Sequence, residues 1–362
     1  MRRALELAHH AIALSDPNPR VGCVLTTPDG QLLGEGFTQQ PGGPHAEIMA
    51  LRDAAARGSD VRGALAYVTL EPCSHHGRTG PCCDALAAAG VAKVIASLQD
   101  PNPLVAGQGF ARLRAAGIAV ETGPGARESR ELNIGFFSRM QRGRPWVRLK
   151  VAASLDGQTA LANGRSQWIT GEDARADGHA WRARAGAILT GIGTVLEDDP
   201  RLDVRLARVA RQPPLVVVDS RLQTPPAAAL FAVPDRAVWI YAAEEHADAQ
   251  RALEAQGATV ILLPGSGGKV DLAALLKDLA GRGVNELHVE SGFKLNGSLL
   301  REGLVDEFLV YLAPRLLGAG QGMVNIGPLQ DLAEGVALEF GSVERVGTDL
   351  RVLARPPGRA DF

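Results

Sequence analysis

Hydrophobic positions in the first 100 residues change their spacing several times, which predicts a succession of helices and strands. Apolar residues recur at helical spacing near the N-terminus, and short apolar runs bounded by turn residues then indicate strands. The expected order is helix, strand, strand, helix, strand, helix, strand, which favours a three-layer α/β/α sandwich. The expected helices are 4–12, 46–57 and 82–90, and the expected strands are 21–27, 32–38, 66–70 and 93–98.

In the rest of the chain, strand-like runs alternate with helical stretches, which predicts a mainly parallel sheet covered on both faces. Gln141-Arg142-Gly143-Arg144-Pro145 follows an expected helix at 127–139 and indicates a boundary between domains 1–143 and 144–362. The expected strands are 147–153, 187–189, 215–218, 238–241, 260–263, 287–289 and 308–312, and the expected helices are 174–184, 246–256 and 272–281.

Length and composition limit the classes of protein to which the chain can belong. The 362 residues exceed one ordinary core, and 46% hydrophobic with 22% charged residues is typical of a soluble globular protein. A net charge of −2 gives no basic footprint for nucleic acid, so a small-molecule substrate is expected. Glu6, His9 and His10 interrupt any signal-peptide core, and no apolar run approaches the roughly 18 residues of a membrane span. We therefore expect a cytoplasmic protein without a membrane partner.

The strongest candidate chemistry lies in Pro44-His45-Ala46-Glu47, Pro72-Cys73 and Pro81-Cys82. One histidine and two cysteines can supply three ligands of a tetrahedral zinc site and leave the fourth position for water. Glu47 follows His45 by two residues, so it could transfer protons without binding the metal, as in zinc nucleobase deaminases. Zinc in such sites lowers the pKa of bound water towards about 7. These residues therefore predict a hydrolytic deaminase.

Two simpler explanations of the cysteine cluster stay open. A closed structural zinc site would take His75, His76 or Cys83 as its fourth ligand, although the absence of a tight Cys-x-x-Cys pair counts against it. A disulfide between Cys73 and Cys82 is disfavoured, because nothing else in the chain resembles a secreted protein. His75 and His76 could instead contact a substrate beside the metal.

Two further kinds of turn are candidates for ligand contacts. Asp16-Pro17-Asn18-Pro19 is a stiff turn, and Asn18 could bind the edge of a heterocycle or simply shape the loop. In the second half, glycine-bearing turns at 190–194 and 290–297 could place backbone N–H groups against phosphates. No Gly-x-Gly-x-x-Gly follows the first strand of that half, so ordinary loop geometry is the simpler explanation.

Longer runs of sequence are specific to one family. Val68-Thr69-Leu70-Glu71-Pro72-Cys73-Ser74-His75-His76-Gly77-Arg78-Thr79 closely resembles the deaminase half of the bifunctional riboflavin-biosynthesis deaminase/reductases, as do residues 17–22 and 45–47. The long gap between the cysteines is that family's own pattern, although Gly80 stands where proline is usual. The resemblance implies a cytidine-deaminase-like domain in which His45, Cys73 and Cys82 bind Zn²⁺ and Glu47 carries protons.

Residues 150–157, 166–170, 190–205, 219–220 and 289–292 look like the reductase half of the same family. That half is similar in fold to dihydrofolate reductase and uses NADPH, while Asp203 stands where threonine is frequent. By this resemblance, cofactor contacts would fall on Ala152, Trp168, Thr194, Asp198, Ser220, Gly292, Phe293, Lys294, Leu295, Asn296, Gly297 and Ser298. Substrate contacts would fall on Ser166, Arg182, Leu202, Arg205 and Glu290.

The resemblance implies two successive steps on one phosphorylated pyrimidine. The 2-amino group of 2,5-diamino-6-ribosylamino-4(3H)-pyrimidinone 5′-phosphate would be removed by hydrolysis, and NADPH would then reduce the ribosyl side chain to ribityl. A homo-oligomer is usual for such folds. Two alternatives are a zinc deaminase whose second domain only binds nucleotide or mediates assembly, and a zinc-stabilised scaffold without activity.

Overall fold

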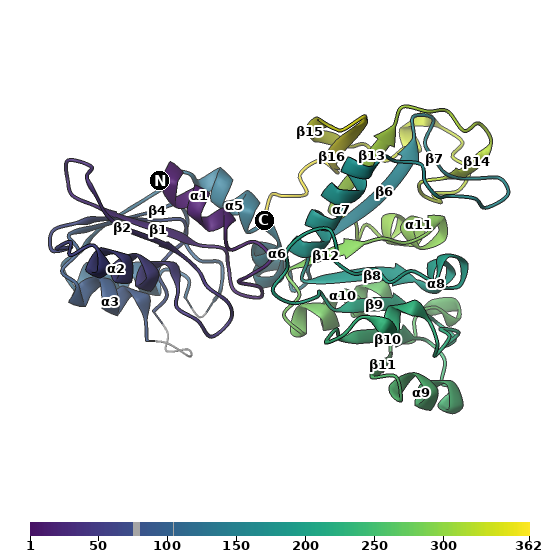
Figure 1. Ribbon diagram of the computed structural model, residues 1–362, viewed down its shortest axis with the longest axis horizontal. Coiled ribbons are helices and arrows are strands. Elements are labelled where there is room, and N and C mark those ends of the chain that lie inside the picture. Colours follow the sequence, from purple (N-terminus) through teal and green to yellow (C-terminus); the bar gives the residue numbers. More distant parts are fainter. Residues whose placement is uncertain (75–79, 104) are drawn as a thin grey trace. The chain divides into compact units, whose positions relative to one another are not determined.

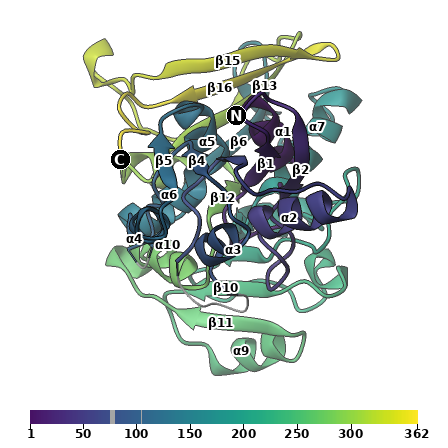
Figure 2. The same ribbon diagram turned by 90° about the vertical axis from the view of Figure 1, so that its left-hand side faces the viewer.

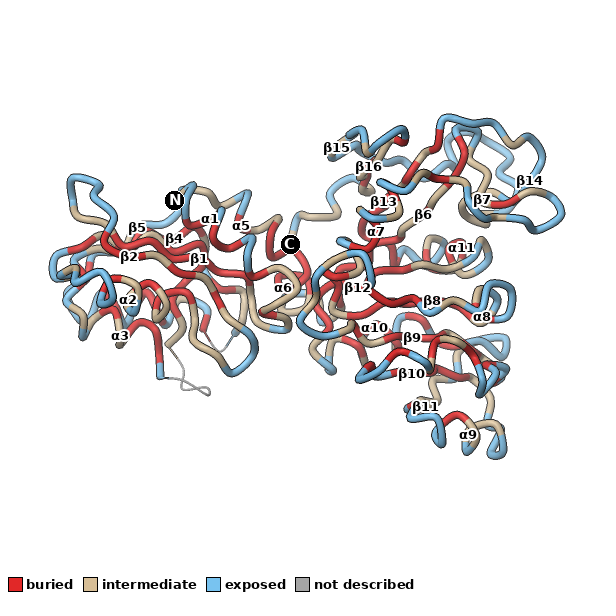
Figure 3. The backbone as a smooth tube through the Cα atoms, viewed as in Figure 1, coloured by how far each residue is buried: buried red, intermediate tan, exposed pale blue. Residues whose placement is uncertain are grey.

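The computed structural model describes residues 1–74, 80–103 and 105–362, which form two compact units, Met1–Gly143 and Arg144–Phe362 (Figure 1). Buried backbone is concentrated along the strands of each unit (Figure 3). Among the described residues, no helix combines the length and the apolar character that crossing a membrane requires.

The first unit is built on a five-stranded sheet with the order β2-β1-β3-β4-β5. Strand β1 (Gly22–Thr26) pairs antiparallel with β2 (Leu32–Phe37) and with the central strand β3 (Leu65–Val68). Strands β4 (Lys93–Ala96) and β5 (Ala119–Thr122) continue the sheet in parallel with β3. The ends of β3 and β4 therefore point in the same direction, towards the loops that carry the candidate chemistry.

Helices lie on both faces of this sheet, as the hydrophobic pattern predicts. Figures 1 and 2 show α1 (Arg2–His9) and α5 (Ala126–Leu132) on one face, and α2 (Ala46–Ala56) and α3 (Cys82–Ala88) on the other. Two glycines of β2 let α2 approach closely: a Cβ atom on Gly36 would lie 2.6 Å from the backbone nitrogen of Ala50, and one on Gly34 2.4 Å from its carbonyl oxygen. The predicted three-layer sandwich is confirmed.

The structure differs from the sequence prediction in the last third of this unit. The single helix expected at 127–139 is two helices, α5 and α6 (Ile134–Arg142), which are separated at Asn133. The Asn133 side chain accepts a hydrogen bond from the Arg20 backbone N–H and donates one to the Arg20 carbonyl oxygen, at 2.7 and 3.0 Å. Helix α4 (Gln108–Ala115) and β5 were not predicted, and β5 is a short, mostly exposed edge strand without a clear apolar pattern.

The second unit contains a nine-stranded sheet with the order β11-β10-β9-β8-β12-β6-β13-β16-β15. The strands from β11 to β13 in this order are parallel, which confirms the predicted sheet, whereas β16 and β15 are antiparallel. The strands are β6 (Trp146–Ser154), β8 (Ala187–Gly191), β9 (Leu215–Val218), β10 (Val238–Ala242), β11 (Ala258–Leu262), β12 (Glu286–Val289), β13 (Glu307–Ala313), β15 (Glu339–Val346) and β16 (Asp349–Arg355). A separate pair is formed by β7 (Gln158–Leu161) and β14 (Gly320–Gly322).

The helices of the second unit cover both faces of its sheet. One core is formed between the strands and the apolar sides of α10 (Leu272–Gly281) and α11 (Phe293–Arg301). On the opposite face lie α7 (Glu172–Arg184), α8 (Ile192–Asp198) and α9 (Ala247–Glu254). Short 3-10 turns occur at Ala229–Ala232, Ser266–Gly268 and Leu332–Glu334.

Candidate active sites

Two helix starts and one loop bring the three predicted zinc ligands together. His45 is the residue before the first turn of α2, Cys82 is the first residue of α3, and Cys73 lies in the loop after β3. The His45 Nδ1 atom is 3.5 Å from the sulfur of Cys73 and 3.5 Å from that of Cys82, and all three donor atoms lie within 4.8 Å of one another. A tetrahedral zinc ion bound at about 2.0 Å from nitrogen and about 2.3 Å from sulfur requires a nitrogen–sulfur separation of about 3.5 Å. The three side chains therefore fit zinc.

Glu47 lies in the first turn of α2, beside these donors, and is only 3% exposed. Burial and the negative charge of Cys73 raise the pKa of the Glu47 carboxyl to about 7. A carboxyl group with a pKa near neutrality can accept a proton and release it in the same reaction cycle. The buried position that raises its pKa thus also suits Glu47 to proton transfer.

The environment of the two cysteines favours metal binding. The Cys82 thiol and His45 lower the pKa of Cys73 to about 4, and the Cys82 backbone N–H donates to the Cys73 sulfur at 3.4 Å. All four cysteines are free, which excludes the disulfide alternative. Cys83 points elsewhere, with its sulfur 3.7 Å from Asp84 Oδ1, and within the described parts of the chain no fourth histidine, cysteine or carboxylate completes the group. His75 and His76 lie outside the described residues.

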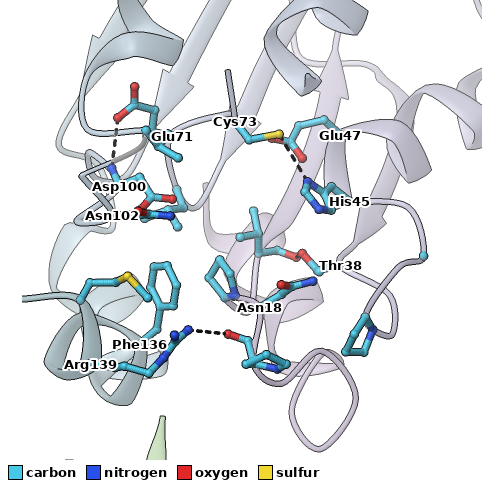
Figure 4. Close-up of a pocket in the computed structure, with 18 of the residues that line it drawn as sticks. Asn18, Thr38, His45, Glu47, Glu71, Cys73, Asp100, Asn102, Phe136 and Arg139 are labelled. Carbon is cyan, nitrogen blue, oxygen red and sulfur yellow. Dashed lines mark hydrogen bonds between the residues drawn. The ribbon is translucent and has the colours of Figure 1, made fainter. Parts of the chain in front are cut away.

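His45, Cys73 and Glu47 line a cavity of about 520 Å³ (Figure 4). Asn18 lines this cavity, as does Asn102 from the second Asp-Pro-Asn-Pro turn, and a ring-binding role for Asn18 stays a prediction. Thr38 and Asp100 also line it, and burial raises the pKa of the Asp100 carboxyl to about 7. The repeated Asp-Pro-Asn-Pro sequence, at residues 16–19 and 100–103, was the sequence signal for Asn18, Asp100 and Asn102.

Glu71, which follows β3, holds one side of the cavity in place. Its carboxylate accepts hydrogen bonds from the backbone N–H groups of Asp100, Gly107 and Phe110 at 2.9 to 3.1 Å. These contacts tie the loop that starts at Asp100 and the first turn of α4 to the end of β3. Glu71 is thus a structural residue of the cavity wall.

The second unit has its own cavity, of about 960 Å³, beyond the carboxyl ends of β6, β8 and β12. This is where open α/β sheets commonly bind ligands. The cavity wall includes most of the cofactor residues expected from the resemblance: Ala152, Trp168, Thr194, Asp198, Gly292, Phe293 and Asn296. It also includes all the expected substrate residues of this unit: Ser166, Arg182, Leu202, Arg205 and Glu290.

Five expected cofactor residues are not part of this cavity wall: Ser220, Lys294, Leu295, Gly297 and Ser298. Leu295 packs against the hydrophobic core, and a Cβ atom on Gly297 would lie 2.0 Å from the Asn325 carbonyl oxygen. The Ser298 hydroxyl donates to the Lys294 carbonyl oxygen at 3.2 Å. Leu295 and Gly297 thus have evident packing roles, and the cofactor contacts of all five remain predictions.

Glu290 is the centre of a charged cluster in this cavity. Arg182 binds both of its carboxylate oxygens, and Lys150 Nζ and His288 Nε2 each lie 3.3 Å from one of them. Although burial opposes ionisation, Arg182 and Lys150 hold the pKa of Glu290 well below its usual range. Burial also lowers the pKa of His288, so the imidazole is neutral at pH 7. Glu290 is therefore a fixed negative charge between two cations.

A second charged group surrounds Asp203, at the rim of the same cavity. Its carboxylate is 2.8 Å from Arg205 Nη1 and 3.3 Å from Arg201 Nε, and its carbonyl oxygen accepts a hydrogen bond from Arg182 at 3.0 Å. His179 Nδ1 accepts a hydrogen bond from the Arg205 backbone N–H at 3.3 Å. Asp203 is only 5% exposed, so the carboxylate faces the arginines and not the solvent.

The cavity also suits a dinucleotide. Gly292 precedes the first turn of α11, whose N-terminus has no side-chain cap, so the first N–H groups of the helix are available to a pyrophosphate. A Cβ atom on Gly292 would meet only Thr194 Oγ1 within 4 Å, at 3.7 Å, which leaves this backbone open. The Trp168 side chain is 61% exposed and presents a flat surface, with the Arg175 guanidinium 4.7 Å from its ring centroid. These features fit NADPH.

Known proteins resemble the chain over nearly its full length. Residues 145–352 match the family model of the RibD C-terminal domain, and residues 1–98 match that of the cytidine and deoxycytidylate deaminase zinc-binding region. The riboflavin biosynthesis protein RibD of Escherichia coli (strain K12) is 46% identical over an alignment of 363 positions, which covers 97% of this chain and 96% of that protein. Its counterpart in Haemophilus influenzae is 41% identical, over 99% of this chain and 97% of that protein.

Two solved structures agree with these matches. RibD of Acinetobacter baumannii has a TM-score of 0.89 at 40% identity, and covers 98% of this chain and 97% of its own. A Thermotoga maritima protein, titled a diaminohydroxyphosphoribosylaminopyrimidine deaminase/5-amino-6-(5-phosphoribosylamino)uracil reductase, has a TM-score of 0.87 at 32% identity with the same coverage.

The expected fold is thereby confirmed, as a cytidine-deaminase-like domain followed by a reductase domain similar to dihydrofolate reductase. The reductase domain implies the use of NADPH, and the alternatives of an inactive second domain and of an inactive scaffold are set aside. Together with the zinc-binding site of His45, Cys73 and Cys82, these matches place the chain in the RibD family of bifunctional deaminase/reductases of riboflavin biosynthesis.

Proposed function

We propose that this chain first deaminates 2,5-diamino-6-ribosylamino-4(3H)-pyrimidinone 5′-phosphate and then reduces the ribosyl side chain of the product, 5-amino-6-(5-phosphoribosylamino)uracil, with NADPH. The observation that carries the proposal is the convergence of His45, Cys73 and Cys82 at one end of a cavity, with Glu47 buried beside them. The Thermotoga maritima relative is named for the same two activities.

In the first step, Glu47 performs the proton transfers of a hydrolytic deamination. Zinc held by His45, Cys73 and Cys82 would supply the Lewis acid that activates water. The Glu47 carboxylate takes a proton from the attacking water and returns it to the departing amino group, which leaves as ammonia. A pKa of about 7 supports both transfers at neutral pH.

In the second step, residues of the second cavity bind and orient the reactants. Bound NADPH would supply the hydride for C1′ of the ribosyl group. The guanidinium groups of Arg182 and Arg205 can bind a phosphate or sugar oxygen through two parallel hydrogen bonds. Glu290 fixes the orientation of Arg182 by binding it through both carboxylate oxygens.

We assign each step to one unit, with deamination in residues 1–143 and reduction in residues 144–362. The described residues that line each cavity all belong to its own unit, which supports this assignment. The two half-reactions should then respond separately to substitutions in either cavity.

The test is to add the diaminopyrimidinone phosphate to the purified full chain with NADPH and to follow ammonia and NADPH together. Ammonia release should precede NADPH oxidation, and omission of NADPH should leave ammonia release unchanged. NADPH oxidation without prior deamination, or the absence of either product, would contradict the proposed sequence.

We further propose that the protein is cytoplasmic and forms a homo-oligomer. Four free cysteines are typical of a reducing compartment, which supports the location. The edge strand β15 supports self-association, because Phe340 and Val343 are 76% and 53% exposed there and the outer backbone edge of the strand is unpaired in the sheet. Light scattering of the purified protein would contradict the proposed homo-oligomer if it found only monomers.

A further inference from the structure

Part of the first cavity is built by segments that lie outside the deaminase zinc-binding region. The family match to that region ends at residue 98. Beyond it, the loop that starts at Asp100 and helix α6 add Asn102, Phe136, Arg139 and Met140 to the cavity wall. The zinc chemistry is therefore contained in the matched region, whereas this added wall can contact the part of a substrate that other deaminases do not share.

Arg139 stands out in the added wall because of its charge. Among the described residues that line the cavity, it is the only arginine or lysine. Its Nη2 donates to the Pro17 carbonyl oxygen at 3.2 Å, and its guanidinium carbon lies 5.8 Å from the centroid of the Phe136 ring. These contacts, both to residues of the cavity wall, hold the side chain at the cavity (Figure 4).

Arg139 is a partly buried cation in the wall of the cavity. Burial lowers the pKa of its guanidinium, and the nearby Asp16 carboxylate offsets this effect only in part. A bound anion would stabilise the charged form of a partly buried guanidinium. Figure 4 shows Arg139 at the end of the cavity away from His45 and Glu47, so a ligand could reach both ends at once.

We propose that Arg139 binds the 5′-phosphate of the pyrimidine substrate in the deaminase cavity. This inference rests on the proposed function, in which the substrate carries a phosphate monoester on its ribosyl arm. The carboxylates of Glu47 and Asp100 lie in the cavity wall and repel a phosphate dianion, whereas a guanidinium attracts it and can bind it through two hydrogen bonds. The phosphate then fixes the distance and direction of the ring, whose amino-bearing carbon points towards the zinc ligands.

The test compares two substrates, the phosphorylated diaminopyrimidinone and its dephosphorylated counterpart, in the full zinc-loaded chain. The wild type should deaminate the phosphorylated compound with a kcat/KM roughly 10- to 100-fold higher, which is the range expected for hydrogen bonds between charged groups. Arg139→Gln should remove this preference by lowering kcat/KM for the phosphorylated compound alone. Arg139→Lys keeps the charge but not the fork, and should keep part of the preference.

Two controls separate binding from folding. Arg130 on helix α5 has its guanidinium 4.9 Å from the centroid of the Phe137 ring but does not line the cavity. Arg130→Ala should therefore keep the full preference. Zinc content and NADPH-dependent turnover of each variant report on the fold. If Arg139→Gln loses zinc, the result for Arg139→Lys is decisive. A partly kept preference in Arg139→Lys supports the proposal, and its complete loss contradicts the proposal.

The possible results distinguish the inference from the function on which it rests. No phosphate preference in the wild type, or an equal loss for both compounds in Arg139→Gln, would overturn the role of Arg139 while deamination itself stood. Failure of the wild type to deaminate either compound would overturn the proposed function.

Discussion

The zinc site and the reductase cavity are built in different ways, although both lie at strand ends of α/β sheets. In the first, three side chains bring their donor atoms within 4.8 Å of one another. In the second, a cavity of about 960 Å³ collects residues from Lys150 to Met323, and exposed backbone, a flat indole and ion pairs all contribute. Metal chemistry depends on a few side-chain atoms, whereas nucleotide binding depends on shape and backbone.

This difference has a consequence for mutational sensitivity. Removal of one group from the zinc site should abolish one reaction, because among the described residues no further metal-binding side chain joins the group. Removal of one group from the reductase cavity should weaken binding by a limited factor, because many contacts share the energy.

The largest expected effect is that of Glu47→Gln. Deamination should fall by about 10³-fold, since general acid–base catalysis typically contributes 10²- to 10⁴-fold. Zinc content and NADPH-dependent reduction of the deaminated product should stay at wild-type levels. The exposed Glu6→Gln serves as the matched control, and retained ammonia release in Glu47→Gln would remove this residue from the mechanism.

Arg205→Ala should have a smaller effect, and on the other reaction. Its guanidinium lines the second cavity beside Asp203, so its loss should lower kcat/KM of reduction roughly 10- to 100-fold and leave deamination unchanged. Steady-state assays of both half-reactions would measure this. An equal loss of both activities would point to a folding defect instead of a binding role.

His179 should make the stability of the protein depend on pH. Burial, Arg182 and Arg205 lower the pKa of this imidazole to about 4, so between pH 4 and about 6.5 the unfolded chain binds more protons than the folded chain. The free energy of unfolding should therefore decrease as pH falls through this range, by roughly 2 kcal/mol for this group. In His179→Asn this part of the dependence should disappear in thermal unfolding at pH 4.5 and 7. An identical pH dependence in both proteins would contradict it.

The smallest effect concerns Asp203, where the family resemblance leads us to expect threonine. Its carboxylate pairs with Arg201 and Arg205, so it competes with a substrate phosphate for both cations. Asp203→Thr should lower the KM of reduction a few-fold and leave kcat unchanged. A higher KM would show that Asp203 instead holds the arginines in the orientation that substrate needs.

The same contrast explains how much could be predicted from the sequence. His45, Glu47 and Cys82 were identifiable because zinc accepts few side chains and because their positions at helix starts follow from local sequence. The order of helices and strands up to β4 and the parallel sheet were likewise predictable from apolar spacing.

What could not be predicted depends on contacts between distant residues. The break between α5 and α6 lies at Asn133, whose side chain binds the backbone of Arg20, 113 positions earlier. Arg139 lies on α6, after this break, and no local pattern predicts that it lines the cavity. Leu295 and Gly297 belong to a glycine-bearing run that the resemblance assigned to the cofactor, yet their side-chain positions are used for packing.

The most direct test of two separate chemistries in one chain is zinc removal with both half-reactions measured on the same preparation. The untreated protein should contain one zinc ion per chain. Chelation should abolish ammonia release, leave NADPH oxidation on the deaminated product intact, and be reversed by added zinc. Ammonia release that survives complete loss of zinc, or loss of both reactions together, would contradict the assignment of two separate chemistries to this chain.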